Sequence, residues 1–262
     1  MMRVLAACDW FSPGTGGGAE RVAWEVYCRF AASGHRVTVV ATIPDDTRFA
    51  APPVSGLEIV PVRSRDLSRL ARAQISLAVG VGRALDRAAE ALQPDVVHAN
   101  SLQFQTTPAA AEISRRRSIP FVVTGHIGAL DTLGGLLGIA ARCHERFIAR
   151  RVLRSATRAI AVSAAVRTHL TMLAPEVPVD VVPNGVDHDR FSVRAPRPDR
   201  SGPFRIVLVG RLVPNKGPRT AVEAVARLRE QGAQVCLDVV GDGPLRPGLE
   251  RVVRARGLSG VV

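Results

Sequence analysis

The chain has 262 residues, of which 47% are hydrophobic and 4% aromatic, so it can bury one large core or two modest ones. Its formal net charge of +12 attracts anions, but no recognition helix, aromatic-interleaved basic strand or zinc-finger spacing accompanies it, which argues against nucleic acid as a partner. The four cysteines are scattered without a CxxC pair, so neither a disulfide framework nor a structural zinc site is indicated.

Short apolar runs bounded by turn residues alternate with longer helical patterns from the start of the chain. The spacing predicts helices over Glu20–Ser33, which stops at Gly34, and over the Ala-rich Leu67–Leu92, whose middle is weakened by Gly80 and Gly82. The alternation predicts an α/β fold with a parallel sheet covered by helices. The predicted strands are Val4–Cys8, Arg36–Ala41, Leu57–Pro61, Val96–Ala99, Phe121–Thr124, Ala159–Val162 and Val179–Val182.

The stretch Val193–Pro203 is rich in proline, arginine and small residues, and it predicts an interdomain linker. We therefore expect a first domain over residues 1–192, a linker over 193–203 and a second, incomplete domain over 204–262. This second domain has only two complete predicted strands, so it buries little apolar surface and leaves an apolar sheet edge unpaired. The elements predicted after the linker are a strand Phe204–Val209, a helix Gly217–Gln231, a strand Gln234–Val240, a helix Leu245–Gly257 and the start of a strand at Val261.

The loop after the first strand is rich in glycine, including Gly16, Gly17 and Gly18, and it leads into a helix. Glycines let a backbone approach a ligand, and helix N–H groups favour an anion, so this loop is a candidate phosphate cradle. Its alternatives are a flexible glycine loop without a ligand and, read as Gly14-x-Gly16-x-x-Ala19, a dinucleotide-binding fingerprint. In that second case Asp45 and Asp46 would contact the ribose of an NAD-dependent oxidoreductase.

A second strand–loop–helix segment, Val209–Gly217, carries Arg211 and Lys216, the sole lysine of the chain. Two cations beside a helix N-terminus suit a diphosphate, because charge-assisted hydrogen bonds to phosphate are strong. As isolated residues they would be solvated surface groups, but their position in this loop favours phosphate binding.

Four motifs occur in an order that resembles retaining GT-B glycosyltransferases of family 4, and they extend across almost the whole chain. The motifs are Gly17-Gly18-Ala19-Glu20-Arg21-Val22, Pro183-Asn184-Gly185-Val186-Asp187, Gly210-Arg211-Leu212 with Lys216-Gly217, and Gly241-Asp242-Gly243-Pro244. The resemblance implies two facing Rossmann-like domains. It also implies a UDP-sugar or GDP-sugar donor held mainly by the C-terminal domain, a glycan or lipid-linked acceptor held mainly by the N-terminal one, and no metal or other cofactor.

The same resemblance assigns roles to individual residues. Arg211 and Lys216 are expected to neutralise the donor diphosphate, and Gly16, Gly17 and Gly18 to approach it from the N-terminal domain. His126, in Val123-Thr124-Gly125-His126, matches the family histidine beside the transferred sugar. It is expected to contact a sugar hydroxyl, and its alternative role is a structural histidine at a strand end. Retention is implied through same-face attack within an ion pair, and no paired carboxylates argue otherwise.

The chain also departs from the family pattern. Many relatives carry a second histidine two positions after His98, where this chain has Asn100, which puts the acceptor-side contacts in question. The family's pair of glutamates and its base-binding loop would fall after Val262, so we expect a C-terminally truncated enzyme. The alternative is an inactive fragment.

A basic amphipathic helix is predicted over Ala141–Arg158, where apolar side chains such as Phe147 and Ile148 alternate with arginines. Such a helix lies on anionic lipid or forms the solvated face of a packed helix. Met1–Ala7 leads into a strand without the regions of a signal peptide. We therefore expect a cytoplasmic protein, and the alternative to a solvated helix face is peripheral contact at the inner face of the cell membrane.

Overall fold

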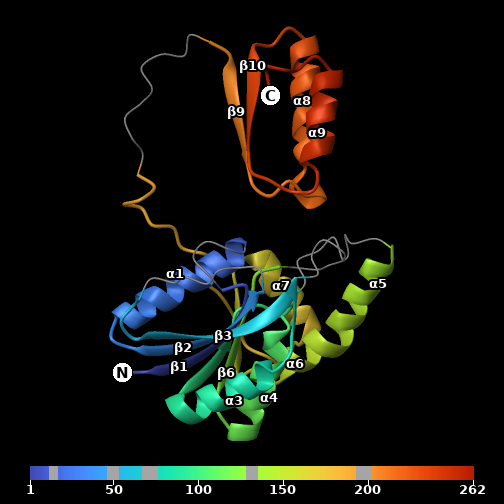
Figure 1. Ribbon diagram of the computed structural model, residues 1–262. Coiled ribbons are helices and arrows are strands. Elements are labelled where there is room, and N and C mark those ends of the chain that lie inside the picture. The colour runs from blue at the N-terminus through green and yellow to red at the C-terminus, as the bar shows by residue number, and fades with distance from the viewer. Residues whose placement is uncertain (12–16, 46–52, 67–75, 128–134, 193–201) are drawn as a thin grey trace. The chain divides into compact units, whose positions relative to one another are not determined.

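The computed structural model describes residues 1–11, 17–45, 53–66, 76–127, 135–192 and 202–262. They form two compact units, Met1–Asp187 and His188–Val262, each built of parallel strands and helices (Figure 1). Of the predicted linker over 193–203, only Gly202 and Pro203 are among the described residues. The domain limits drawn from the sequence therefore stay a prediction.

The first unit contains an eight-stranded sheet with the order β4-β3-β2-β1-β5-β6-β7-β8. Neighbouring strands are parallel except β3 and β4. Every strand predicted for this part of the chain is present, so the predicted α/β fold class is confirmed. The strands are β1 Arg3–Asp9, β2 Arg36–Pro44, β3 Leu57–Asp66, β4 Ser76–Ala78, β5 Val96–Ala99, β6 Phe121–Gly125, β7 Arg158–Ala161 and β8 Val179–Val181.

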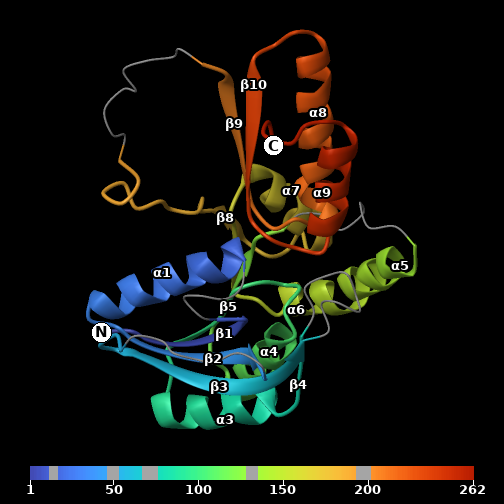
Figure 2. The same ribbon diagram turned by 45° about the horizontal axis from the view of Figure 1, so that its top comes forward.

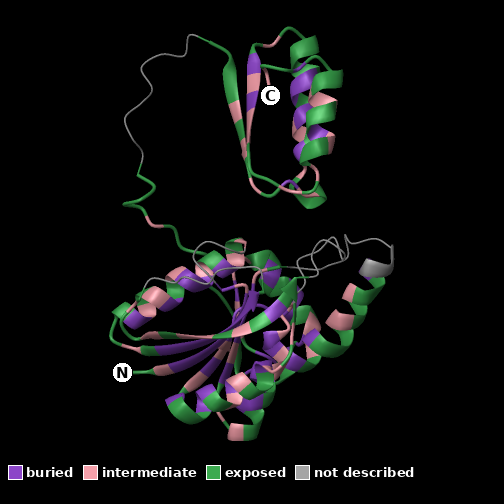
Figure 3. Ribbon diagram, in the orientation of Figure 1, coloured by how far each residue is buried: buried purple, intermediate pink, exposed green. Residues whose placement is uncertain are grey.

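Helices cover both faces of this sheet, and Figures 1 and 2 show α1 on one side and α3 with α4 on the other. Alternate residues of β1 point to opposite faces: Leu5 and Ala7 pack with α3, α4, α6 and α7, whereas Val4, Ala6 and Cys8 pack with α1. The central strands β1 and β2 are accordingly buried almost throughout, whereas β3 and β8 are partly exposed (Figure 3). The helices are α1 Gly18–Ala32, α3 Val81–Leu92, α4 Thr106–Arg117, α5 Gly135–Cys143, the π-helix η1 His144–Ala149, α6 Arg150–Arg154 and α7 Ala164–Leu173.

The predicted helix over Leu67–Leu92 is wrong in its middle, and its first part, 67–75, lies outside the described residues. Ser76–Ala78 is the short strand β4, which pairs antiparallel with β3. Gly80 then takes a left-handed conformation with φ of 92° and caps α3. A helix could not continue through that backbone conformation, which glycine adopts without the steric cost a side chain would bring.

The predicted basic helix over Ala141–Arg158 is confirmed only as far as Arg154, where α5, η1 and α6 end as one continuous helical segment. Arg158 is the first residue of β7, and its guanidinium donates to Asp180 on β8 at 2.8 Å. Strand pairing with β6 and β8 therefore removes the end of this segment from the helix.

The second unit contains two parallel strands with two helices packed on them. The elements are β9 Phe204–Val209, the 3-10 helix η2 Pro214–Lys216, α8 Pro218–Glu230, β10 Val235–Val240 and α9 Arg246–Ala255. The strands and helices predicted here are confirmed, apart from the strand at Val261, which is a turn residue. Its carbonyl accepts a hydrogen bond from the Leu237 N–H at 2.7 Å, which places it beside β10 without forming a ladder. β9 stays exposed (Figure 3), with 70% of Phe204 and 75% of Val209 accessible.

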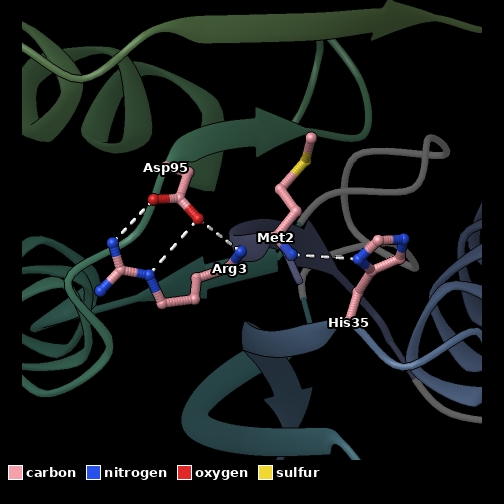
Figure 4. A network of polar contacts seen from close by, with 4 residues as sticks. All are labelled: Met2, Arg3, His35 and Asp95. Atoms are coloured by element: carbon pink, nitrogen blue, oxygen red, sulfur yellow. Dashed lines mark hydrogen bonds and ion pairs between the residues drawn. The ribbon is translucent and has the colours of Figure 1, made fainter.

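The amino-terminal edge of the large sheet is held by a polar network (Figure 4). The Arg3 guanidinium donates to Asp95 at 2.7 and 3.3 Å, and the Arg3 backbone N–H donates to the same carboxylate at 2.8 Å. The Met2 N–H donates to His35 Nδ1 at 3.1 Å. The Arg3 hydrogen bonds lower the pKa of Asp95. These contacts join the start of β1 to the segments that precede β5 and β2, and so fix the register of the central strands.

Candidate functional site

The candidate site of the first unit lies where β1, β5 and β6 end. The strand order reverses at β1, with β2 on one side and β5 on the other. In open α/β sheets, ligands bind at such a switch point, beyond the carboxyl ends of the strands. Three polar residues stand at these ends in this chain: Asp9 closes β1, Asn100 follows β5 and His126 follows β6.

His126 is half-buried, and its ring Nε2 lies 3.2 Å from Asn100 Oδ1. Its other ring nitrogen, Nδ1, is buried and has no hydrogen-bond partner in the described part of the chain. Burial lowers the pKa of His126, so the ring is neutral at pH 7. The structure thus presents a neutral imidazole with one ring nitrogen left over for a ligand.

Asn100, which the sequence marked only as a departure from relatives, is 3% exposed and reaches two elements. Its Nδ2 donates to the carbonyl of Ala19 in the first turn of α1 at 3.1 Å. Its backbone N–H donates to Ala7 in β1 at 3.1 Å. The structure therefore brings the glycine-loop end of α1 and His126 together through one amide side chain.

A second histidine, His98, is half-buried next to this site. Its Nδ1 lies 2.6 Å from the Tyr27 hydroxyl on α1, and its Nε2 lies 2.8 Å from the Thr124 hydroxyl on β6. Burial, with a smaller contribution from the neighbouring His126, lowers its pKa to about 4. Because both ring nitrogens are occupied, His98 holds α1 against the sheet and does not face a ligand.

The glycine loop is described only from Gly17 onward, and the predicted contact at Gly16 lies outside the described residues. Gly17 precedes α1, and its N–H donates to the Glu20 carboxylate at 2.6 Å. Gly18, the first helical residue, is exposed, and a Cβ added there would meet nothing within 4 Å. Glu20 therefore occupies one of the N–H groups that the sequence offered to a phosphate, while Gly18 keeps an open approach to the helix start.

Asp9 is a buried carboxylate that the sequence did not single out. It is 4% exposed, and its Oδ2 accepts from the Gln105 N–H at 2.9 Å. The hydroxyls of Thr42 and Thr106 are buried beside the same carboxylate. Burial raises the pKa of Asp9 to about 6, although hydrogen bonds from Gln105, Thr106 and Thr42 lower it. A signal was available, because a polar residue that ends a buried parallel strand points to the ligand edge of the sheet.

In the second unit, the loops that follow β9 and β10 are bonded to each other. The Gly210 N–H donates to Val240 at 3.0 Å, and the Leu212 N–H donates to Asp242 at 2.8 Å. Gly241 has a φ of 151°, and a Cβ there would lie 1.9 Å from the Gly210 carbonyl oxygen. Only glycine fits at this crossing, so the Gly241-Asp242-Gly243-Pro244 motif shapes the loop that carries Arg211.

Arg211 and Lys216 are both exposed on this β9–α8 loop, and neither forms an ion pair within the described residues. Gly217, with a left-handed φ of 62°, caps α8 directly after Lys216. Side-chain cations left free beside a helix N-terminus are available to an anionic ligand. The arrangement fits the diphosphate role predicted for them, which stays a prediction.

The residues of the dinucleotide alternative are mostly outside the described ranges, since Gly14, Gly16 and Asp46 all fall there. Asp45 is described, and it is exposed after β2. Among the described residues, no three His, Cys, Asp or Glu side chains gather in a way that could hold a metal ion. None of the described helices is both long and apolar enough to cross a membrane.

Two protein-family models match the chain. The model described as Glycosyltransferase Family 4 matches residues 16–190, more than half of the chain, and the model described as Glycosyl transferases group 1 matches residues 189–262. The two matched ranges meet close to the point where the described structure divides into its two units.

Individual proteins are similar as well. A glycogen synthase of Mycobacterium tuberculosis is 27% identical over 99% of this chain and 67% of its own length. A 2-deoxystreptamine glucosyltransferase of Streptomyces kanamyceticus is 33% identical over 58% of this chain and 42% of its own length. Among solved structures, Anabaena HepE in complex with UDP superposes with a TM-score of 0.68 at 19% identity, covering 100% of this chain and 68% of that one.

Proposed function

Because the chain belongs to glycosyltransferase family 4 and has the GT-B fold, we propose that it transfers a hexose from a nucleoside-diphosphate sugar to a glycan or lipid-linked acceptor. The observation that carries the proposal is the placement of His126, Asn100 and the start of α1 together at the switch point of the first sheet. UDP in the HepE complex and the sugar transferred by the related glucosyltransferase support a nucleotide-sugar donor.

Arg211 and Lys216 are the residues that we assign to the donor diphosphate. When the bond between the anomeric carbon and the diphosphate oxygen breaks, negative charge collects on the departing diphosphate. Fixed donors aimed at such charge lower the barrier, typically by about 3 to 4 kcal/mol for one donor. Both side chains are exposed and free of ion pairs in the described residues, which supports this assignment.

His126 is the residue that we assign to the transferred sugar. Burial keeps its ring neutral at pH 7 and leaves Nδ1 unpartnered in the described structure, which suits a hydrogen bond from a sugar hydroxyl. In the proposed transfer, the acceptor hydroxyl oxygen bonds to the anomeric carbon as the diphosphate leaves, and the hydroxyl proton passes to the diphosphate. Attack from the same face as departure gives retention.

Ligand-induced stabilisation separates the candidate functions. UDP, GDP, their glucose and mannose conjugates, and NAD are each titrated while thermal unfolding is followed. Stabilisation by a nucleotide sugar supports the transferase, stabilisation by NAD alone supports an oxidoreductase, and the absence of any response supports an inactive chain. Arg211→Ala and Lys216→Ala should each remove most of the stabilisation, whereas Arg229→Ala, in the last turn of α8 and so away from the loop, should leave it unchanged.

His126→Ala should reduce turnover far more than it reduces affinity for the nucleoside diphosphate, since the ring is assigned to the sugar and not to the phosphates. Both are measured on the same preparation, turnover by release of the nucleoside diphosphate and affinity by calorimetry. Equal losses of turnover and affinity would remove the proposed role of His126.

We also propose that the segment α5–η1–α6 contacts an anionic membrane surface. Ile139, Phe147 and Ile148 are exposed, with 66% of the Phe147 side chain accessible, and exposed Arg142 and Arg146 lie among them. Apolar side chains inserted between headgroups, together with arginines that attract lipid charge, are the two components of interfacial binding.

Liposome flotation tests this membrane contact. The chain should float with vesicles that contain phosphatidylserine and less with pure phosphatidylcholine. Phe147→Ser with Ile148→Ser should weaken the binding, and Val26→Ser, an exposed apolar residue on α1, is the matched control. Equal flotation with both vesicle types would count against the proposal.

A further inference from the structure

Asn100 makes three side-chain hydrogen bonds, one of them from Nδ2 to Cys8 Sγ at 3.7 Å, and the directions of the other two are fixed by chemistry. Its amide lies between the Ala19 carbonyl oxygen, 3.1 Å from Nδ2, and His126 Nε2, 3.2 Å from Oδ1. A backbone carbonyl can only accept, so the amide nitrogen must point to α1 and the amide oxygen to His126. The position of Ala19 thus determines which end of the amide the histidine meets.

The amide oxygen in turn determines where the proton of His126 resides. An amide oxygen can only accept, so Nε2 of the ring must carry the hydrogen. Burial lowers the pKa of this ring and keeps it neutral, and a neutral imidazole carries only one N–H. The remaining nitrogen, Nδ1, is then a bare acceptor, and it is the ring atom that is buried without a partner in the described residues.

We infer that Asn100 is a positioning residue: it selects the Nε2–H tautomer of His126 and ties the ring to the first turn of α1, so that Nδ1 accepts a hydrogen bond from a ligand hydroxyl. The assignment of that hydroxyl to the transferred sugar rests on the proposed function. The tautomer itself does not rest on it. His126 therefore acts as an acceptor of a hydrogen bond and not as a proton donor to the departing group.

Among the described residues, Asn100 is the side chain that hydrogen-bonds to the ring of His126. His98 is the other imidazole nearby, and its two nitrogens are occupied by Tyr27 and Thr124. Asn100 is itself 3% exposed and also anchored through its backbone N–H to Ala7. A rigid, buried amide can hold one tautomer of its neighbour, because reversing the amide would set its NH2 group against the ring N–H and its oxygen against the Ala19 carbonyl.

Nitrogen-15 NMR of the full chain with labelled histidine tests the tautomer without any requirement for activity. In the unaltered chain, His126 should show a protonated Nε2 and a pyridine-type Nδ1. Asn100→Ser should give a mixture of tautomers, and Asn100→Asp should raise the pKa of His126, because a carboxylate then faces the ring. Thr124→Val is the matched control, since it should change the signals of His98 only.

Kinetics then connect the tautomer to the proposed function. Asn100→Asp and Asn100→Ser should lower kcat about 10- to 100-fold through loss of positioning, and should change the Kd for UDP or GDP less than about twofold. The pH profile of kcat for Asn100→Asp should shift upward with the raised pKa of His126. The inference would be overturned if the unaltered chain carried the hydrogen on Nδ1. It would also be overturned if the tautomer ratio were unchanged in Asn100→Ser. The first measurement does not depend on whether Asn100→Ser folds. The Nε2–H tautomer of His126 in a chain without transferase activity would support the inference and contradict the proposed function.

Discussion

Asparagine in place of Asp9 should stabilise the first unit at neutral pH. Asp9 is 4% exposed at the end of β1, and burial raises the pKa of its carboxyl from 3.8 to about 6. Asparagine is neutral at every pH, its Oδ1 can still accept from Gln105, and its NH2 group can donate to the hydroxyl oxygens of Thr42 and Thr106, which hydrogen-bond to the carboxylate in the parent. The substitution therefore removes a buried charge and keeps the shape.

The size of the effect comes from the pKa. Between pH 3.8 and about 6 the folded chain binds the Asp9 proton more tightly than the unfolded chain does, so the free energy of unfolding falls as the pH rises through this window. The difference between the pKa of Asp9 in the unfolded chain and in the folded chain corresponds to about 3 kcal/mol of unfolding free energy. Below pH 4 the two proteins should have similar stabilities. Above pH 6 the Asp9→Asn variant should exceed the parent by up to about 3 kcal/mol.

Urea unfolding followed by tryptophan fluorescence is the appropriate assay, because Trp10 and Trp24, the only tryptophans of the chain, both belong to the first unit. The free energy of unfolding is measured at intervals from pH 4 to pH 7.5 for the parent, for Asp9→Asn and for Asp45→Asn, an exposed carboxylate after β2 that serves as control. Parallel pH profiles of parent and Asp9→Asn, or a variant that is less stable at pH 7, would refute the reasoning.

Three further results are expected. Gly241→Ala should lower the unfolding free energy of the second unit by at least about 2 kcal/mol, because its Cβ would lie 1.9 Å from the Gly210 carbonyl oxygen. Gly232→Ala, with a φ of 84° in open space, should lower it by about 1 kcal/mol. Hydrogen exchange in β9 and β10 measures both losses, and equal losses would contradict the steric argument. Tyr27→Phe should lower the unfolding free energy of the first unit by about 1 kcal/mol, since His98 Nδ1 loses its partner; unchanged urea unfolding would show that this bond contributes nothing. Binding of UDP or GDP should weaken as NaCl is added, because the two cations of the β9–α8 loop are exposed and therefore screened; a salt-independent Kd would place the diphosphate elsewhere.

Local pattern was sufficient for the sheet because buried parallel strands are continuous apolar runs. Val4–Cys8, for example, is an unbroken apolar run, and it forms most of β1. The pattern failed at Ser76–Ala78, where an Ala-rich context indicated a helix and pairing with β3 decided for a strand. It failed again at Arg158, where the end of a helical pattern joined β7 because β6 and β8 offered ladder partners on both sides.

The candidate site divides in the same way. His126, Arg211 and Lys216 were found because each follows a strand within a recognisable motif, and their roles stay predictions. Asp9 was missed although it ends the apolar run Val4–Cys8, because the contact that encloses its carboxylate, with Gln105, comes from a segment 96 residues away in the chain. The role of Asn100 was missed as well, because its meaning lies in two contacts, to Ala19 and to His126, that are 81 and 26 residues away in the chain.

By itself the sequence determined the α/β class, the strands of the first sheet other than β4, and the loops that carry candidate chemistry, because hydrophobic period and turn residues act over a few positions. Only the tertiary structure decided which of these loops meet, which N–H of the glycine loop is taken by Glu20, and which nitrogen of His126 is left without a partner among the described residues. Those outcomes depend on hydrogen bonds and burial between distant segments, and such contacts form only when the sheet brings the ends of β1, β5 and β6 to one edge.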